Sequence, residues 1–311
     1  MNILLATDNN FVQHCCVTIT SVLLNNTDVV VFLFTDDLTA SNEKLLQDQT
    51  EKLGGTLIVR RVDGETIAKF PMPKTSGNAH ISVATYYRLF VEELLPLEVD
   101  RILYLDCDMI INESLEELYK TDITNYALAA VYQHNEWAET YKVFERLDYP
   151  KDKGYFNAGM LLINLDYWRS NNVTKRLMDF IKFHYDRILS HDQDVLNAVL
   201  HDETLPVSYK WNYTPIFLNM DRFTFLPHLN YVDGLKPVII HFVSRPKPWQ
   251  YYCKHPYKQL YFDYLSQTPF NGWRPKNSWK EFKEYKLIPF IIRIDKLKIR
   301  YLFITPKKEI Q

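Results

Sequence analysis

Two aspartates separated by a single cysteine follow an apolar run that is typical of a buried strand. The run is Arg101 to Leu105, and the acidic pair is Asp106 and Asp108. In an extended chain, side chains two residues apart point to one side, so both carboxylates can face one ligand. Carboxylate oxygens suit Mg²⁺ or Mn²⁺, with phosphate oxygens completing the coordination shell. The pair therefore predicts a metal and phosphate site, although aspartates also form turns and cap helices.

A histidine and a lysine follow a second apolar run, Pro237 to Ile240. The neutral imidazole of His241 can complete a metal site, and the ammonium group of Lys247 can meet phosphate as a point charge. The alternative interpretation is a histidine that is hydrogen-bonded within the core, beside a loop stiffened by prolines.

Three further segments combine small or polar residues with neighbouring apolar runs. Gly159 precedes an apolar run and permits close approach of the backbone to a ligand, or simply forms a turn into a strand. Asp192 and Asp194 begin an apolar helical stretch, which either of them can cap. Asp8 and Asn10 follow the first strand, where they can bind a base and a ribose, although Asp8 is equally a turn residue.

These residues must be positioned by alternating strands and helices. Apolar runs suited to buried strands are Ile3 to Ala6, Val29 to Thr35, Thr56 to Val62, Arg101 to Leu105, Ala127 to Val131, Met160 to Asn164 and Val238 to Val243. Segments of helical character between them are Thr18 to Asn26, Ser41 to Leu53, Thr85 to Leu94, Val173 to Leu189 and Asp192 to His201. This order predicts an α/β fold with a mainly parallel sheet covered by helices on both faces.

The setting of the acidic pair supports its chemistry. Ser114, followed by Glu117, is a capping-box pattern and predicts a short helix over Leu115 to Tyr119 after a turn. Asp106 and Asp108 then lie at the carboxyl end of a strand, which is where open α/β sheets bind ligands.

Composition excludes several classes of protein. The 311 residues are 47% apolar, and 36 basic residues nearly cancel 38 acidic ones, so no strong field favours nucleic acid as a partner. The cysteines lack the spacing of a disulfide framework or a zinc site, which favours a reducing compartment; they are Cys15, Cys16, Cys107 and Cys253. No signal peptide and no membrane-spanning run is recognisable, and we expect a cytoplasmic protein.

The C-terminal segment has a different composition. Residues 273–311 hold eleven Lys or Arg against four Asp or Glu, which gives a net charge of +7. Leu287 to Ile304 interleaves apolar and basic residues, as expected of an amphipathic helix on an anionic membrane surface. The alternative is an ordinary helix that packs on the domain with a solvated basic face.

Taken together, these segments resemble glycosyltransferase family 8, and in particular its bacterial lipopolysaccharide galactosyltransferases and glucosyltransferases. The matching stretches are Ile3 to Asn10, His80 to Arg88, Arg101 to Asp108, Tyr155 to Asn164, Asp192 to Asp194 and His241 to Trp249. The resemblance implies the GT-A fold, with a catalytic domain over residues 1–250, and composition predicts a helical, basic and aromatic tail over 251–311.

The resemblance also implies roles for individual residues. Asp106, Asp108 and His241 would bind Mn²⁺ or Mg²⁺, and Gln193 would lie beside the anomeric carbon of a UDP-hexose. The donor-binding residues would be Ala6, Thr7, Asp8, Asn10, Arg88, Asp106, Cys107, Asp108, Asn157, Ala158, Gly159, Asp192, Gln193, His241, Ser244 and Lys247. The outcome in this family is retention, by front-face substitution or by a covalent route through a carboxylate such as Asp192.

The acceptor side is marked less clearly. His80, Thr85 and Gln133 match acceptor positions by the resemblance, but Gln133 stands where the lipopolysaccharide galactosyltransferases carry an acidic residue. Ser244 replaces a glycine of the family loop, which can change the loop conformation if that position needs a positive φ.

The leading hypothesis is a metal-dependent transferase that moves glucose or galactose from UDP to a glycan or glycolipid acceptor in surface-polysaccharide synthesis. A sugar nucleotidyltransferase also uses carboxylates and Mg²⁺, but it needs a glycine-rich, basic loop that the segment Ala6 to Phe11 lacks. A catalytically inactive nucleotide-sugar-binding protein is the third alternative, and the presence of every proposed metal ligand argues against it.

Overall fold

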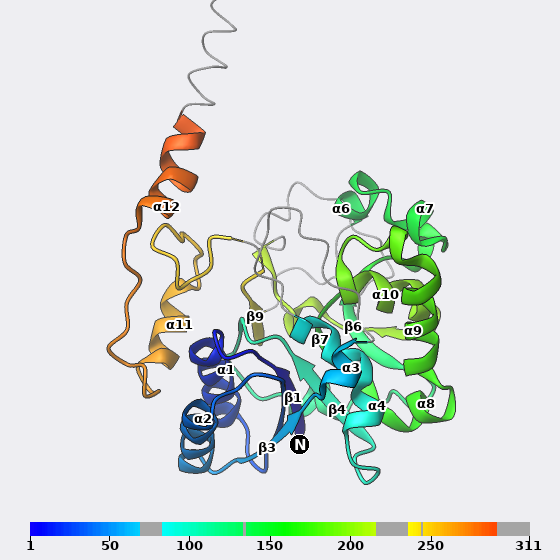
Figure 1. Ribbon diagram of the computed structural model, residues 1–311, viewed down its shortest axis with the longest axis horizontal. Coiled ribbons are helices and arrows are strands. Elements are labelled where there is room, and N and C mark those ends of the chain that lie inside the picture. Colours follow the sequence, from blue (N-terminus) through cyan, green and yellow to red (C-terminus); the bar gives the residue numbers. More distant parts are fainter. Residues whose placement is uncertain (69–82, 133–134, 216–235, 244, 291–311) are drawn as a thin grey trace, which may run out of the picture.

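The central element is a mixed sheet of seven strands within the described part of the chain (Figure 1). The computed structural model describes residues 1–68, 83–132, 135–215, 236–243 and 245–290. In spatial order the strands are β3 (Thr56–Arg61), β2 (Val30–Thr35), β1 (Asn2–Ala6), β4 (Arg101–Leu105), β7 (Phe156–Asn164), β6 (Leu128–Tyr132) and β8 (Thr204–Pro206). Strand β7 runs antiparallel to both of its neighbours, and the other pairs are parallel. The prediction of a mainly parallel α/β sheet is confirmed.

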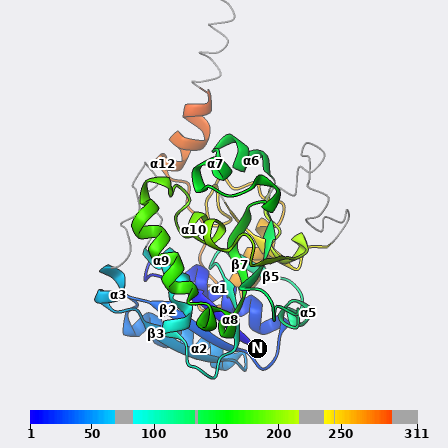
Figure 2. The same ribbon diagram turned by 90° about the vertical axis from the view of Figure 1, so that its right-hand side faces the viewer.

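Both faces of the sheet are buried because the strands carry apolar residues at almost every position. Along β1, Ile3 and Leu5 belong to the core on one face, whereas Leu4 belongs to the core on the other. The first core is covered by α1 (Val12–Asn25) and α2 (Ala40–Lys52). The second core is covered by the 3₁₀ helix η1 (Val83–Phe90) and by α4 (Val91–Leu94), α8 (Leu165–Ser170), α9 (Val173–His184) and α10 (His191–Leu200). Figure 2 shows α8 and α9 on the side facing the viewer.

Shorter elements complete the described chain at the edges of these layers. They are α3 (Gly64–Ala68), α5 (Glu116–Tyr119), α6 (Asn135–Thr140), α7 (Val143–Leu147) and the 3₁₀ turns Lys151–Lys153, Tyr185–Arg187 and Tyr209–Trp211. Among the described residues, no helix is both long and apolar enough to cross a bilayer.

A second, two-stranded sheet was not predicted as such. It pairs β5 (Met109–Ile111) with β9 (Ile239–His241) in antiparallel register. Its apolar side packs against α1 and α11 (Lys258–Leu265), through Ile110 and Ile240. The segment after β4 therefore returns as a strand before α5 begins.

The short helix predicted over Leu115 to Tyr119 is present, but the predicted capping box at Ser114 is wrong. Helix α5 begins at Glu116, and its N-cap residue, Leu115, makes no side-chain capping bond. The Ser114 hydroxyl accepts from the backbone N–H of Glu116 at 3.2 Å, too early in the chain for a capping box.

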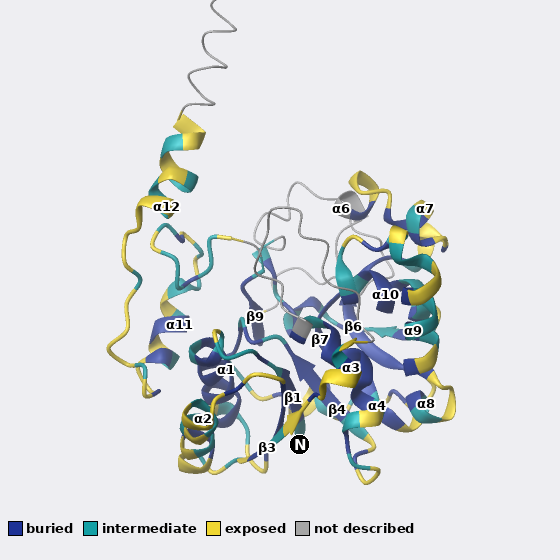
Figure 3. Cartoon of the chain, in the orientation of Figure 1, coloured by how far each residue is buried: buried dark blue, intermediate teal, exposed yellow. Residues whose placement is uncertain are grey.

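The C-terminal segment leaves the body of the molecule after α11. A short helix α12 (Trp279–Phe282) continues into a π-helical turn, Lys283–Leu287, and both extend away from the sheet (Figures 1 and 3). Most of the predicted amphipathic helix, Leu287 to Ile304, lies outside the described residues. The predicted division of the chain at residue 250 stays a prediction.

Truncating the centre of the sheet should destabilise the protein. Leu103 in β4 is fully buried between β1 and β7. Leu103→Ala should therefore lower the free energy of unfolding by about 2–5 kcal/mol, measured by urea denaturation. The matched control is Leu97→Ala, because Leu97 is 79% exposed and its change should stay within about 0.5 kcal/mol. Equal effects of the two substitutions would contradict this account of the core.

Candidate metal and nucleotide-sugar site

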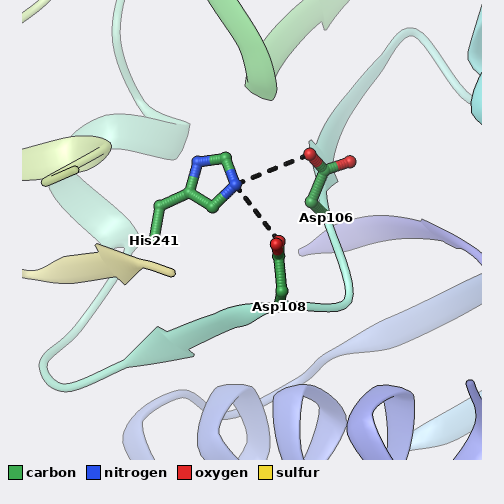
Figure 4. Close-up of side chains that lie close together, drawn as sticks. All are labelled: Asp106, Asp108 and His241. Atoms are coloured by element: carbon green, nitrogen blue, oxygen red, sulfur yellow. Dashed lines mark ion pairs between the residues drawn. The ribbon is translucent and has the colours of Figure 1, made fainter. Parts of the chain in front are cut away.

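The two aspartates of the acidic pair lie at the carboxyl end of β4, as predicted. The backbone N–H of Asp106 donates to the carbonyl of Gly159 at 2.8 Å, which extends the β4–β7 ladder. Beyond it the β5–β9 register places His241 opposite Met109. The Nε2 atom of His241 lies 3.1 Å from Asp108 Oδ1 and 3.7 Å from Asp106 Oδ2 (Figure 4). The pairing of β5 with β9 thus places His241 beside two aspartates that lie more than a hundred residues earlier in the sequence.

The chemistry of these three side chains fits a divalent cation. One ligand atom from each of Asp106, Asp108 and His241 lies within 4.8 Å of the others. Asp108 Oδ1 is buried and accepts no hydrogen bond from the described residues, although a buried carboxylate oxygen normally has a partner. Two carboxylates and an imidazole form a donor set that suits Mn²⁺ and Mg²⁺. These residues would hold the metal.

A buried arginine balances part of the negative charge. Arg88, 5% exposed, donates to Asp106 Oδ1 at 2.8 Å and approaches Asp192 Oδ2 at 3.1 Å. Tyr104 donates its hydroxyl to the same Asp106 oxygen at 2.7 Å. Burial raises the pKa of Asp192 to about 7, although Arg88 acts in the opposite direction. The Asp192 carboxyl group thus contacts the same guanidinium that binds Asp106.

Lys247 balances the other aspartate. Its Nζ lies 2.5 Å from Asp108 Oδ2 and also donates to the carbonyl of Phe242. Burial alone would raise the pKa of Asp108, but Lys247 and His241 hold it well below its ordinary value. The carboxylate is consequently ionised at neutral pH and available to a cation.

The loop that carries Lys247 is fixed by aromatic stacking. Trp249 stacks on His14 of α1, with ring centroids 3.7 Å apart. His14 Nδ1 lies 2.7 Å from the hydroxyl of Tyr261 in α11. Burial lowers the pKa of His14 to about 3, so the ring is neutral where it stacks. The packing of α11 on α1 thereby contributes to the placement of Lys247.

The segment Asn157 to Gly159 belongs to β7 itself, so it is not a turn before a strand. A Cβ atom on Gly159 would lie 2.3 Å from His241 Cε1 and 2.8 Å from Asp106 Oδ2. The glycine is therefore needed for close contact with the metal ligands. Gln193 Oε1 accepts from the backbone N–H of Ala158 at 3.0 Å and from Asn157 Nδ2 at 3.1 Å.

Asp194 has a structural role. It is fully buried and accepts from Arg146 at 2.8 Å, from the Tyr155 hydroxyl at 2.8 Å and from the backbone N–H of Leu189 and Ser190, each at 2.7 Å. Neither Asp192 nor Asp194 is the N-cap residue of α10, since Ser190 occupies that position. Asp194 instead ties the start of α10 to β7.

The amino-terminal residues line a pocket of about 170 Å³ beside the acidic pair. Asp8 forms a turn, because its Oδ1 accepts from the N–H groups of Asn10 and Phe11 at 2.9 and 3.0 Å. The residues lining the pocket are Ala6, Thr7, Asp8, Phe11, Ala84, Thr85, Arg88, Tyr104, Asp106, Cys107 and Asp108. Asn10 is exposed and is not among them. Of the predicted acceptor residues, Thr85 reaches this pocket, whereas His80 and Gln133, like Ser244 of the donor set, lie outside the described residues.

Two residues at the site were missed by the sequence analysis. Tyr104 precedes Asp106 by two positions in an extended strand, so its orientation toward the same side was a usable signal. Asn212 is fully buried, and its Oδ1 lies 2.8 Å from His241 Nδ1. No local pattern marks Asn212, because it follows a single 3₁₀ turn and reaches the site only through tertiary packing.

Replacing Gly159 by alanine should damage the metal site specifically. The added methyl group must displace His241 or Asp106, so Gly159→Ala should weaken Mn²⁺ binding by about tenfold or more, measured by electron paramagnetic resonance of free Mn²⁺. Gly272→Ala is the control, because nothing lies within 4 Å of a Cβ built at that position. Unchanged Mn²⁺ affinity in Gly159→Ala would contradict the assignment of these ligands.

Comparisons with known proteins agree with this geometry. Glycosyl transferase family 8 matches residues 2–253. General stress protein A of Bacillus subtilis (strain 168) is 31% identical over 280 residues, covering 87% of this chain and 95% of that protein. Lipopolysaccharide 1,3-galactosyltransferase of Salmonella typhimurium is 30% identical over 275 residues, covering 87% and 79%.

The solved structures confirm the fold. The galactosyltransferase LgtC, solved in complex with donor and acceptor sugar analogs, superposes with a TM-score of 0.78 at 24% identity, covering 91% of this chain and 99% of that chain. This likeness confirms the predicted GT-A fold. With the family match spanning most of its length, the chain belongs to glycosyltransferase family 8 and is a glycosyltransferase.

Proposed function

We propose that this glycosyltransferase moves glucose or galactose from a UDP-sugar to a hydroxyl of a glycan or glycolipid acceptor, with retention and with Mn²⁺ or Mg²⁺. The observation that carries the proposal is the cluster of Asp106, Asp108 and His241 beside the pocket at the end of β4. The lipopolysaccharide galactosyltransferase among the relatives, and a lipopolysaccharide 1,2-glucosyltransferase of Escherichia coli at 26% identity, support a surface glycan as the product.

Each residue of the site has a role in this proposal. Asp8 and Asn10 contact uracil and ribose, whereas Arg88 and Asp192, with Asn157 and its neighbours, face the hexose. Asp106, Asp108 and His241 would hold the metal, which when bound would neutralise diphosphate charge and make UDP a better leaving group. Lys247 leaves its ion pair with Asp108 to contact the diphosphate and stabilises the charge that develops there.

The contacts of the carboxylate and amide groups support front-face substitution. Asp192 is 4% exposed and is paired with Arg88, so it is poorly placed to attack carbon. The amide oxygen of Gln193 already accepts two hydrogen bonds. In the proposed step the acceptor hydroxyl attacks the anomeric carbon and passes its proton to the departing phosphate oxygen.

The exposed C-terminal aromatics support attachment to an anionic membrane surface as a second part of the proposal. Trp279 is 71% and Phe290 is 61% exposed. Lys280, Lys283 and Lys286 lie between them. Exposed aromatic side chains interleaved with lysines favour the interface of an anionic bilayer. The tail would then hold the enzyme near a lipid-linked acceptor at the inner face of the membrane.

Removing one metal ligand should abolish transfer without unfolding the protein. With Mn²⁺ and a panel of UDP-, GDP- and ADP-hexoses, donor-dependent release of nucleoside diphosphate should occur with UDP-glucose or UDP-galactose. Asp108→Asn should lower this rate at least about a hundredfold, because the amide cannot supply the ligand charge. Asp166→Asn, at an exposed position, is the matched control. Full activity of Asp108→Asn at saturating donor would refute the metal assignment. Release of nucleoside diphosphate from GDP-hexoses alone would refute the proposal that the donor is a UDP-sugar.

The tail can be tested on the full-length chain. Combined replacement of Trp279 and Phe290 by serine should reduce binding to phosphatidylglycerol vesicles about tenfold or more, since two interfacial aromatics are lost. Deletion of residues 274–311 should have the same effect, and neutral phosphatidylcholine vesicles should bind weakly throughout. Leu97→Ser, at another exposed apolar position, is the control. Binding that survives both changes would show that the tail is not the membrane contact.

A further inference from the structure

We infer that Asn212 is a positioning residue for the metal site, which fixes the nitrogen that His241 presents to the two aspartates. This inference rests on the proposed metal dependence and extends it to a residue that is not itself a ligand. Asn212 is fully buried. Its Oδ1 lies 2.8 Å from His241 Nδ1, and its Nδ2 lies 2.8 Å from Asn157 Oδ1. Each end of the amide therefore has a defined partner.

The orientation of these amides is fixed by a backbone group. The N–H of Gly159 can only donate, and it lies 3.0 Å from Asn157 Oδ1. The oxygen of Asn157, and not its nitrogen, must face this N–H group. Asn212 approaches the same oxygen, so it must do so with its NH₂ group. An amide flip of Asn212 would place two oxygens against each other in a buried site.

The orientation of Asn212 in turn selects the tautomer of His241. With its NH₂ directed to Asn157, Asn212 offers only its carbonyl oxygen to the histidine ring. That oxygen needs a donor, so the ring carries a proton on Nδ1, and in the neutral ring Nε2 keeps its lone pair. Nε2 then faces Asp108 Oδ1 at 3.1 Å. Nε2 can meet this oxygen either through a proton or through a cation that binds its lone pair.

The same set of amides reaches the residue proposed to lie beside the sugar. Asn157 Nδ2 donates to Gln193 Oε1 at 3.1 Å, and the backbone N–H of Ala158 donates to that oxygen at 3.0 Å. Hydrogen bonds therefore connect a metal ligand in β9 with Gln193 in α10 through two buried asparagines. Outer partners of this kind orient metal-bound histidines and raise their basicity.

Two substitutions separate the hydrogen bond that Asn212 accepts from His241 from the one that it donates to Asn157. Asn212→Leu has a similar volume but cannot accept from His241, so Mn²⁺ affinity should fall by about 10–100-fold. Asn212→Asp places an oxygen against Asn157 Oδ1 and should lower stability, but it still accepts from Nδ1, so Mn²⁺ affinity of the folded protein should stay within about threefold of the wild type. Mn²⁺ binding is measured by electron paramagnetic resonance of free Mn²⁺, without donor or acceptor sugar, and folding by circular dichroism.

A double-mutant cycle tests whether Asn212 acts through the histidine. In a His241→Ala background, Asn212→Leu should cause no further loss of Mn²⁺ affinity, whereas a general packing defect would persist. Folded Asn212→Leu with wild-type Mn²⁺ affinity would overturn the role of Asn212 alone. If that variant does not fold, a tenfold loss of affinity in Asn212→Asp would overturn it. A wild-type protein that binds no Mn²⁺ yet releases UDP would overturn the metal site as well.

Discussion

The two carboxylates at the end of β4 impose the constraint on which the site depends. Asp106 and Asp108 lie close together in a partly buried place, where uncompensated charge is costly. Their partners come from two other segments, because Arg88 belongs to η1, whereas His241 ends β9 and Lys247 lies in the loop that follows it. The two aspartates are thus contacted by residues from separate parts of the chain.

The sheet supplies the rigidity that such a charge cluster needs. Both faces of β1, β4 and β7 are buried, so these strands cannot shift without exposing apolar side chains. The antiparallel insertion of β7 beside β4 brings Gly159 against Asp106. Because glycine has no Cβ, the His241 ring can occupy that space. Strand β7 therefore contributes both to the packing of the core and to the close packing of the site.

The buried hydrogen bonds beside β7 have fixed donors and acceptors, and this determines the tautomer of His241. Backbone N–H groups of β7 can only donate, so they determine which end of each neighbouring amide faces them. The N–H of Gly159 orients the Asn157 amide, which orients the Asn212 amide, and Asn212 then accepts from His241. The charge of the cluster and the tautomer of its histidine are thus set by different interactions, an ionic one and a hydrogen-bonded one.

The sequence by itself indicated the burial of the sheet on both faces, the acidic pair at a strand end, and every strand of the described chain except β5 and β8. Asp106 and Asp108 were recognisable because short-range alternation places them on one side of a strand end. The order of six short motifs was enough to indicate the family. These features depend on residues that are neighbours along the chain or on their linear order.

The tertiary structure alone decided the pairing of β5 with β9, the contact of Arg88 with Asp192, and the place of Asn212. The local pattern at Ser114 indicated the helix that follows it but not the N-cap residue, which is Leu115. These tertiary contacts join residues from 29 to more than a hundred positions apart, and such pairs leave no periodicity in the sequence. Their geometry arises only when burial of the two apolar faces brings the strand ends together.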